Sequence, residues 1–399
     1  MKKILAVSVC FLLFILTGCR EMPDEVAKQA ETYHIEREVT EKEKTREYLG
    51  RKELSADAEQ ALSKEYENLY FPEKMSAEYA LPEKILSVEM KIAENFTDRF
   101  EEVGADFAKF AGEELWNQKK DKAEVRDYGI ICFEDLAKGI DDEESKYHLE
   151  VGENGFVCQI VPMARELAFE MQKKCLENNY PLYEPASEVE YRLVDGVYTV
   201  RQAVEDVEEW MNTVWKKYEP DFDYRVNAVS VYQADEETCF FSIDVVKFYK
   251  GILISDVDWP RDEGEMTDKY IYSSFWIQMH RRGSIDIFSN LGAILTVDEK
   301  TERELSESYA LSAALQKIEQ EFASFHGLKI QDVDVRFVLK PSYDYHTSNP
   351  YSSGVKIDAR PVWGLPLADR ERSSRKANCQ MAHMVFVDMQ TGNLEYNLQ

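Results

Sequence analysis

Thr199-Val200-Arg201-Gln202-Ala203-Val204 opens the stretch that decides the fold of this 399-residue chain. Thr199 and Gln202 stand three residues apart, the spacing of a capping box, in which two side chains satisfy backbone N–H groups at a helix start. Apolar residues then recur at helical spacing, at Val204, Val207, Met211, Val214, Trp215 and Tyr218. The stretch therefore predicts an amphipathic helix.

Strand-like segments follow this helix. They cover about residues 224–233, 239–250 and 270–279, and a turn at Arg282-Gly283 leads into a last strand at 284–288. An amphipathic helix and a sheet with one apolar face bury each other's apolar sides. The segment therefore predicts one helix packed on an antiparallel meander.

Residues 305–399 follow the same order. The helical stripe consists of Leu311, Leu315, Ile318, Phe322 and Phe325, with Gly327 at the C′ position. Strands are expected at about 332–340, 354–360, 382–389 and 393–397, with a turn at Thr391-Gly392 before the last one. This part of the chain predicts a second helix-plus-meander unit.

Short sequence matches relate the two units. Ser242-Ile243-Asp244-Val245 parallels Lys356-Ile357-Asp358-Ala359, and Arg282-Gly283 parallels Thr391-Gly392. We therefore expect an α+β fold built of repeated helix-on-antiparallel-sheet units, a layout like that of PepSY or cystatin modules. The alternative is a shared layout without duplication, because a helix followed by hairpins is a common order.

The length of the chain indicates several domains. We expect a signal peptide over 1–18, a charged tether over 19–70, an N-terminal α+β domain over 71–195, a first helix-plus-meander unit over 196–298 and a second over 299–399. The tether is rich in charge and poor in large apolar groups, so by itself it cannot bury a core.

The N-terminal domain is expected to begin with residues 76–93, which are rich in apolar and strand-compatible residues, and to continue with two helices and short strands. The first helix starts with Thr97 as N-cap and carries the stripe Phe100, Val103, Phe107 and Phe110. Strands are expected at about 126–133 and 155–161. The second helix carries Ala164, Leu167, Met171 and Cys175 and stops before Pro181.

The N-terminus has the layout of a secretory signal. Met1-Lys2-Lys3 precedes an apolar run from Ile4 to Leu16, and the run ends in Leu16, Thr17, Gly18 and Cys19. This ending resembles a bacterial lipobox, which implies a diacylglycerol thioether on Cys19. We expect no cofactor besides this covalent lipid. The alternatives are a non-lipidated signal or a short anchor, but 13 apolar residues rise only about 20 Å, against a hydrocarbon core of about 30 Å.

The chain is strongly acidic. It has 48 Lys and Arg against 76 Asp and Glu, and removal of Lys2 and Lys3 with the signal lowers the formal charge from −28 to −30. Such a surface repels phosphate backbones, so nucleic acid is excluded as a partner. Solubility of an exposed domain explains the charge equally well.

The other cysteines follow no metal or redox pattern. Apart from Cys10 and Cys19 the chain has five, with no CxxC pair: Cys132, Cys158, Cys175, Cys239 and Cys379. Their apolar neighbours favour buried free thiols. The alternative is a single disulfide between Cys132 and Cys158.

No catalytic motif is present, and we expect no catalytic residue and no metal ligand. The six histidines form no H-E-x-x-H pair, and neither G-x-S-x-G nor G-x-x-x-x-G-K occurs. A Cys-His pair formed only in three dimensions stays open as an alternative. The densest acidic loop contains Asp256, Asp258, Asp262, Glu263 and Glu265, but Pro260 and Arg261 interrupt it where a calcium loop needs a glycine.

Aromatic residues offer a possible contact surface for a sugar or a peptide. The tryptophans considered are Trp210, Trp215, Trp259, Trp276 and Trp363. Trp215 stands at helical spacing and is assigned to the core. Trp259 precedes Pro260 in a polar loop and is the best candidate for an exposed contact.

The second unit ends in motifs that resemble those of a known family. Ala359-Arg360-Pro361-Val362-Trp363-Gly364, followed by Val385-Phe386-Val387-Asp388-Met389-Gln390-Thr391-Gly392, resembles the ends of PepSY-like modules and of the YycH- and YycI-related regulatory proteins. With the lipobox and the tether, the chain resembles Clostridia or other Firmicute surface lipoproteins of unknown function. That class has no established catalytic residues, so the resemblance implies none here.

These patterns predict a protein that is not an enzyme. We expect an extracytoplasmic lipoprotein, held on the cell membrane by its lipid, that serves as an interaction or regulatory module of the cell envelope with a membrane-protein partner. The alternative is a lipoprotein that captures a peptide, sugar or cation for a transporter. An envelope hydrolase is the third possibility.

Overall fold

The computed structural model describes residues 47–71, 81–126, 129–133, 147–161, 174–255, 273–290, 292–323, 328–330, 332–341, 352–367 and 384–397. The chain divides into two compact units, Met1–Glu47 and Tyr48–Gln399, and the described helices and strands lie in the second. They form a mixed α+β fold, as the sequence predicts. No helix in the described ranges combines the length and apolar character needed to cross a bilayer.

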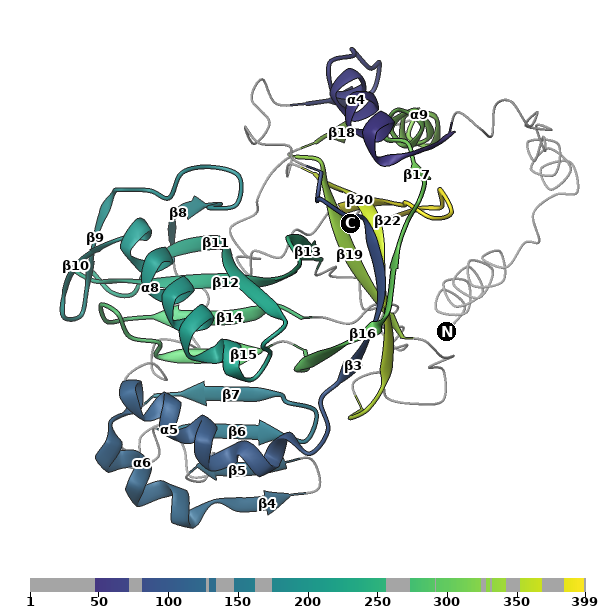
Figure 1. Cartoon of the computed structure of the whole chain (residues 1–399). Helices are drawn as coiled ribbons and strands as arrows, with labels where there is room; N and C mark the ends of the chain where they lie inside the picture. The colour runs from purple at the N-terminus through teal and green to yellow at the C-terminus, as the bar shows by residue number, and fades with distance from the viewer. Residues whose placement is uncertain are drawn as a thin grey trace, which may run out of the picture. The chain divides into compact units, whose positions relative to one another are not determined.

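The first helix-plus-meander segment forms close to the expected positions. Its elements are α8 (Val200–Thr213), η5 (Trp215–Lys217), β11 (Phe222–Gln233), β12 (Cys239–Tyr249), β14 (Phe275–Met279) and β15 (Ile287–Asn290). The predicted capping box is confirmed, because Thr199 Oγ1 accepts from Gln202 N at 3.1 Å and Thr199 N donates to Gln202 Oε1 at 3.0 Å. β12 pairs antiparallel with β11 and β14, and β14 with β15. In Figure 1, α8 lies across these strands.

The second segment also begins with a helix. It consists of α9 (Leu311–Glu321), β19 (Asp334–Pro341), β20 (Lys356–Pro366), β21 (Met384–Asp388) and β22 (Leu394–Asn397). Consecutive strands of this set pair antiparallel. Gly392 makes the predicted turn with φ 68°, and Asp388 Oδ1 accepts from Thr391 N at 2.9 Å. Phe325 and Gly327 lie outside the described residues.

The N-terminal part contains more strands than expected. Its elements are β3 (Leu86–Ile92), η1 (Phe96–Arg99), α5 (Phe100–Ala111), α6 (Glu113–Lys119), η2 (Lys120–Lys122), β4 (Glu124–Arg126), β5 (Gly129–Phe133), β6 (His148–Gly152), β7 (Val157–Ile160), β8 (Cys175–Asn179), β9 (Glu190–Leu193) and β10 (Gly196–Thr199). The apolar stripe of α5 is buried as predicted.

Two local predictions in this part are wrong. Thr97 is not an N-cap, because a 3₁₀ turn precedes α5 and places Arg99 at its N-cap position. Cys175 does not continue a helix, because it begins β8, which pairs with β11. The rest of that expected helix, residues 162–173, lies outside the described residues.

One sheet connects the expected domains. It contains sixteen strands of the described residues, in the order β16-β3-β20-β19-β13-β12-β14-β15-β7-β6-β5-β4 with four further strands beside this path. β13 (Ile252–Ile254) pairs parallel with β19 and so connects the two meanders. β16 (Leu295–Glu304) runs across the expected 298/299 boundary and pairs with β3. The expected boundaries therefore do not separate compact units.

The tether prediction is wrong for its last part, residues 48–70. β1 (Tyr48–Leu49) pairs with β17 (Ser308–Tyr309), and β2 (Leu69–Tyr70) pairs with β18 (Leu328–Lys329). Between them, α4 (Arg51–Leu62) packs on α9. The segment is folded because α4 buries a narrow stripe of Leu54, Ala58 and Ala61 against the rest of the protein.

A side chain of α4 completes the start of α9. The N-cap residue of α9 is Ala310, which has no side-chain acceptor. Asp57 of α4 supplies the missing acceptor, since its carboxylate accepts from Ser312 N at 2.9 Å and from Ser312 Oγ at 2.5 Å. A carboxylate near a helix N-terminus also interacts favourably with the helix dipole. The contact therefore fixes α4 on α9.

Aromatic side chains join α5 to the first meander. Phe107 of α5 lies 5.0 Å from Phe288 and 5.2 Å from Trp210, measured between ring centroids. Trp215 is fully buried, as predicted, and its ring lies 4.7 Å from Phe288 and 5.6 Å from Phe275. Aromatic pairs at these separations add about 0.5–1.5 kcal/mol each beyond the area that they bury.

A buried ion pair lies beneath this aromatic cluster. Lys247 Nζ is 2.5 Å from Glu219 Oε1, and both residues are almost completely inaccessible to solvent. The same oxygen accepts from Leu295 N at 2.8 Å, and Glu219 Oε2 accepts from Tyr224 Oη at 2.8 Å and Trp215 Nε1 at 3.3 Å. Burial, with the Glu219 carboxylate nearby, raises the pKa of Tyr224 well above its usual value.

Two cysteines in the described part of the chain bear out the prediction of free thiols. Cys158 and Cys239 carry free thiols. The alternative disulfide is wrong, because β6 lies between Cys132 on β5 and Cys158 on β7. Two strand spacings separate them by about 10 Å, and a disulfide needs Cα atoms within about 7 Å. Cys379 lies outside the described residues.

Loss of the buried ion pair should strongly destabilise the protein. We expect Lys247→Met to lower the free energy of unfolding by about 3–5 kcal/mol, because Glu219 then stays buried without its cation. The exposed pair of Lys216 with Asp223 provides the control, and Lys216→Met should cost less than about 1 kcal/mol. Urea unfolding measures both. If Lys247→Met lowers the free energy of unfolding no more than Lys216→Met does, the assignment of a buried Lys247–Glu219 ion pair is contradicted.

Alkaline pH should also destabilise the fold. Burial raises the pKa of Tyr66 to about 12 and that of the Cys158 thiol to about 12. In the unfolded chain these values are about 10 and about 8.5, so the folded state holds both protons more tightly. The free energy of unfolding should therefore fall as the pH rises through this range.

Urea midpoints between about pH 8 and about pH 11 test this sign. Tyr66→Phe should make the decline shallower, whereas Tyr70→Phe, at a ring that is 55% exposed, should leave it unchanged. A midpoint that stays constant across the range would refute the expectation.

Candidate functional site

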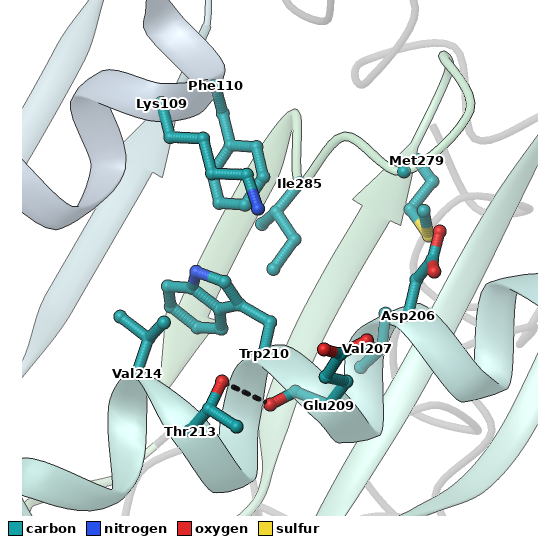
Figure 2. Close-up of a pocket in the computed structure, with 11 residues that line it drawn as sticks. Lys109, Phe110, Asp206, Val207, Glu209, Trp210, Thr213, Val214, Met279 and Ile285 are labelled. Atoms are coloured by element: carbon teal, nitrogen blue, oxygen red, sulfur yellow. Dashed lines mark hydrogen bonds between the residues drawn. The ribbon is translucent and has the colours of Figure 1, made fainter.

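A pocket lies where α5, α8 and the turn between β14 and β15 meet. Its volume is about 270 Å³. The lining residues are Lys109, Phe110, Asp206, Val207, Glu209, Trp210, Thr213, Val214, Met279, Gly283 and Ile285. Figure 2 shows the side chains of α5 on one wall and those of α8 on the opposite one. The pocket therefore combines an apolar interior with charged groups from both helices.

Trp210 supplies a buried hydrogen-bond donor to this pocket. The residue is only 5% exposed, and its ring stacks on Trp215 with centroids 6.1 Å apart. Its Nε1 has no hydrogen-bond partner within the described part of the chain. Figure 2 shows the edge that carries this nitrogen facing Lys109 across the gap between the helices. An indole N–H can only donate, so the site lacks an acceptor at this point.

The charged side chains of the pocket differ in their interaction partners. Lys109 is exposed, and its Nζ lies 5.3 Å from the centre of the Phe110 ring, with no ion pair to any other described residue. Asp206 accepts a short hydrogen bond from Tyr198 Oη. Glu209 is exposed on α8, and its backbone carbonyl accepts from Thr213 Oγ1 at 2.6 Å. The pocket thus presents a cation on α5 and carboxylates on α8.

A buried carboxylate fixes the third wall. Asp286 is fully buried and accepts from His280 N at 2.8 Å, Arg281 Nε at 2.9 Å and Ser284 Oγ at 3.0 Å. Arg281 also donates to the carbonyl of Phe110 at 3.2 Å, which connects the turn to the end of α5. Gly283 makes this turn with φ 59°. Asp286 therefore positions the turn against both helices.

A second hollow is lined by residues of β3, β16 and β20. It has a volume of about 430 Å³ and is lined by Ser87, Val88, Glu89, Thr301, Arg303, Asp358, Ala359, Arg360 and Gln390. Its carboxylates already have cationic neighbours, since Glu89 lies 2.6 Å from Lys356 Nζ and Asp358 lies 3.4 Å from Arg360. No buried polar side-chain atom without a partner lines it among the residues described. The first pocket is the better candidate for a ligand.

Most of the site residues expected from the sequence lie outside the described residues. This holds for Cys19, for Leu16, Thr17 and Gly18 before it, for Trp259, and for the acidic loop from Asp256 to Glu265. Of the tryptophans considered, Trp363 and Trp215 are core residues, whereas Trp210 lines the pocket. Trp210 is among the aromatic residues considered for a contact surface, but no sequence pattern distinguishes it from the other tryptophans.

No metal centre is evident in the described ranges. They contain no group of three or more His, Cys, Asp and Glu residues that could hold a metal ion. The groups that converge on the pocket are donors, carboxylates and apolar side chains. Such a set can bind a ligand through hydrogen bonds and charge.

Comparisons with known proteins add little to this geometry. No family model matches the chain, and no curated protein matches it. One similar solved structure is that of an uncharacterized protein from Eubacterium rectale, with 14% sequence identity and a TM-score of 0.48. The match covers 84% of this chain and 92% of that one. At this similarity the match carries no argument about function.

The Asp286 contacts predict a structural role for this residue at the pocket wall. Asp286→Asn should lower the free energy of unfolding by about 3 kcal/mol, because it removes a buried charge and turns an amide donor toward other donors. The control is Asp195→Asn, at an exposed carboxylate that accepts from Arg282 N at 3.0 Å, which should cost less than about 1 kcal/mol. Urea unfolding compares them. If both variants lower the free energy of unfolding by the same small amount, the structural role assigned to Asp286 is wrong.

Proposed function

We propose that this protein is a lipoprotein held on the outer face of the cell membrane by a lipid on Cys19. The observation that supports this proposal is the sequence Leu16-Thr17-Gly18-Cys19 at the end of an apolar run. Two or more acyl chains give durable anchoring, whereas one chain binds only marginally. Residues 48–70 belong to folded elements, so they are not part of the tether that would separate the folded part from the membrane.

The proposed role is that of a non-catalytic interaction or regulatory module of the cell envelope. The layout of two helix-plus-meander units supports it: α8 precedes β11, β12, β14 and β15, and α9 precedes β19, β20, β21 and β22. In each unit a glycine with positive φ, Gly283 or Gly392, stands before the last strand. We interpret the units as PepSY-like repeats. The partner would be a membrane protein of the envelope.

A second function, capture of a small ligand, is favoured by the pocket between α5 and α8. The supporting observation is Trp210 Nε1, a buried donor with no partner among the described residues. Both functions suit a lipid-anchored protein, because a bound ligand can alter what the folded part contacts.

Lipidation predicts a specific effect of one substitution. Cys19→Ala should abolish the lipid and release the protein from membranes, because the acylated thiol is lost. Cys10→Ala, within the apolar run, is the matched control and should leave both the lipid and the membrane attachment unchanged. Mass spectrometry of the mature N-terminus and membrane fractionation measure the two outcomes. An unmodified N-terminus in the native protein would refute the anchor.

Crosslinking in native membranes then tests the interaction role. The full chain is compared with a variant that keeps the lipid and the tether but lacks residues 48–399. We expect a reproducible membrane-protein partner with the full chain only. If nothing exceeds the tether-only control, the regulatory role is wrong and ligand capture becomes the better account.

A further inference from the structure

The unpartnered indole of Trp210 defines what the pocket must bind. A buried donor without an acceptor costs about 1–3 kcal/mol, and a ligand oxygen placed there would remove that cost. Trp210 is held in place by rings on several sides, including Phe107 at 5.2 Å and Phe110 at 5.8 Å. The ring therefore cannot turn away to find another acceptor. The ligand must bring an acceptor atom to Nε1.

Lys109 identifies this acceptor as anionic. Its ammonium group approaches the same gap from α5, and Figure 2 shows it facing the Nε1 edge of Trp210. No described carboxylate forms an ion pair with it. An oxygen that accepts from both Nζ and Nε1 would form a charge-assisted hydrogen bond, roughly twice as strong as a neutral one. A carboxylate supplies two such oxygens.

The remaining charges favour a cationic group on the same ligand. Glu209 and Asp206 line the α8 wall, and the protein as a whole carries a formal charge of −28. Such a field repels molecules with a net negative charge within the roughly 10 Å over which salt leaves it unscreened. A ligand with both a carboxylate and an ammonium group avoids this repulsion, and its ammonium group can pair with Glu209.

Size and lining restrict the ligand further. A volume of about 270 Å³ falls just below the range of about 300–1,000 Å³ typical of drug-sized ligands. The apolar part of the lining consists of Phe110, Val207, Val214, Met279 and Ile285. A small molecule with an apolar side chain fits both constraints.

We propose that the pocket between α5 and α8 binds a small zwitterion with an apolar side chain, namely an amino acid or a dipeptide. Its carboxylate accepts from Trp210 Nε1 and Lys109 Nζ, and its ammonium group lies toward Glu209. The proposal rests on the ligand-capture function proposed above and names its substrate class. It does not depend on the lipid anchor.

Calorimetric titration of the full chain in detergent tests the proposal. The probes are L-leucine, L-phenylalanine and L-alanyl-L-leucine, together with leucinamide and N-acetyl-leucine, which each lack one charge. We expect saturable binding of at least one zwitterion, and binding weaker by about tenfold or more for both derivatives. Cys19→Ala should bind as the native protein does, so failure of the anchor and failure of the pocket are separate results.

Three variants locate the binding. Trp210→Phe, Lys109→Gln and Glu209→Gln should each weaken it by about tenfold or more. Lys64→Gln and Glu205→Gln, at exposed positions outside the pocket, are the matched controls and should not. Lys109 and Glu209 are exposed, so their variants keep the test valid if Trp210→Phe unfolds. Absence of saturable binding at millimolar probe, equal binding of N-acetyl-leucine, or an unchanged Lys109→Gln variant would each overturn the proposal.

Discussion

The carboxylate of Glu219 is the group on which the arrangement of the central sheet depends. Four donors reach its two oxygens, at 2.5 to 3.3 Å, from Lys247, Leu295, Tyr224 and Trp215. An ion moved into the protein interior loses several kcal/mol of hydration, and only a complete set of partners offsets this loss. Since the donors come from η5, β11, β12 and β16, these four elements are stable only in one mutual arrangement.

This arrangement also explains why Trp210 is held rigidly at the pocket wall. Trp215 and Trp210 stack at an angle of 29°, and both are buried. Trp215 donates to Glu219 within the core, whereas Trp210 donates to no described residue. One network therefore satisfies the inner indole and holds the outer one rigid at the pocket wall. A donor held in place before binding loses little conformational entropy when a ligand arrives.

The sequence predicts local structure well where the signal itself is local. The Thr199–Gln202 capping box, the apolar stripe of α8, and strands β11 and β12 appear within a few residues of their expected positions. Each depends on contacts among near neighbours or on a regular period. The strands around the motif of Pro361 and Trp363 also form, with β20 longer than predicted.

Features that depend on distant residues could not be read in the same way. The segment around α4 resembles a tether in composition, and its fold depends on Asp57 reaching Ser312, 255 positions away. The parallel pairing of β13 with β19 joins segments about eighty residues apart in sequence, and no local sequence pattern predicts this pairing. The pocket is similar, because Lys109 and Trp210 belong to two different helices and face each other only in the folded protein.

A helix from outside each helix-plus-meander unit packs on the helix of that unit, and the two contacts differ in whether they satisfy buried polar groups. α4 packs on α9, and there the exposed donors of a helix start are satisfied by Asp57. α5 packs on α8 through Phe107 and Trp210, but within the described part of the chain Trp210 Nε1 has no hydrogen-bond acceptor and Lys109 no ion pair. A contact that existed only for stability would gain from satisfying the buried Trp210 donor, as the first contact satisfies the start of α9. That the second contact leaves this donor unsatisfied is the physical reason for the proposal that it binds a ligand, whereas the α4–α9 contact supports the structure.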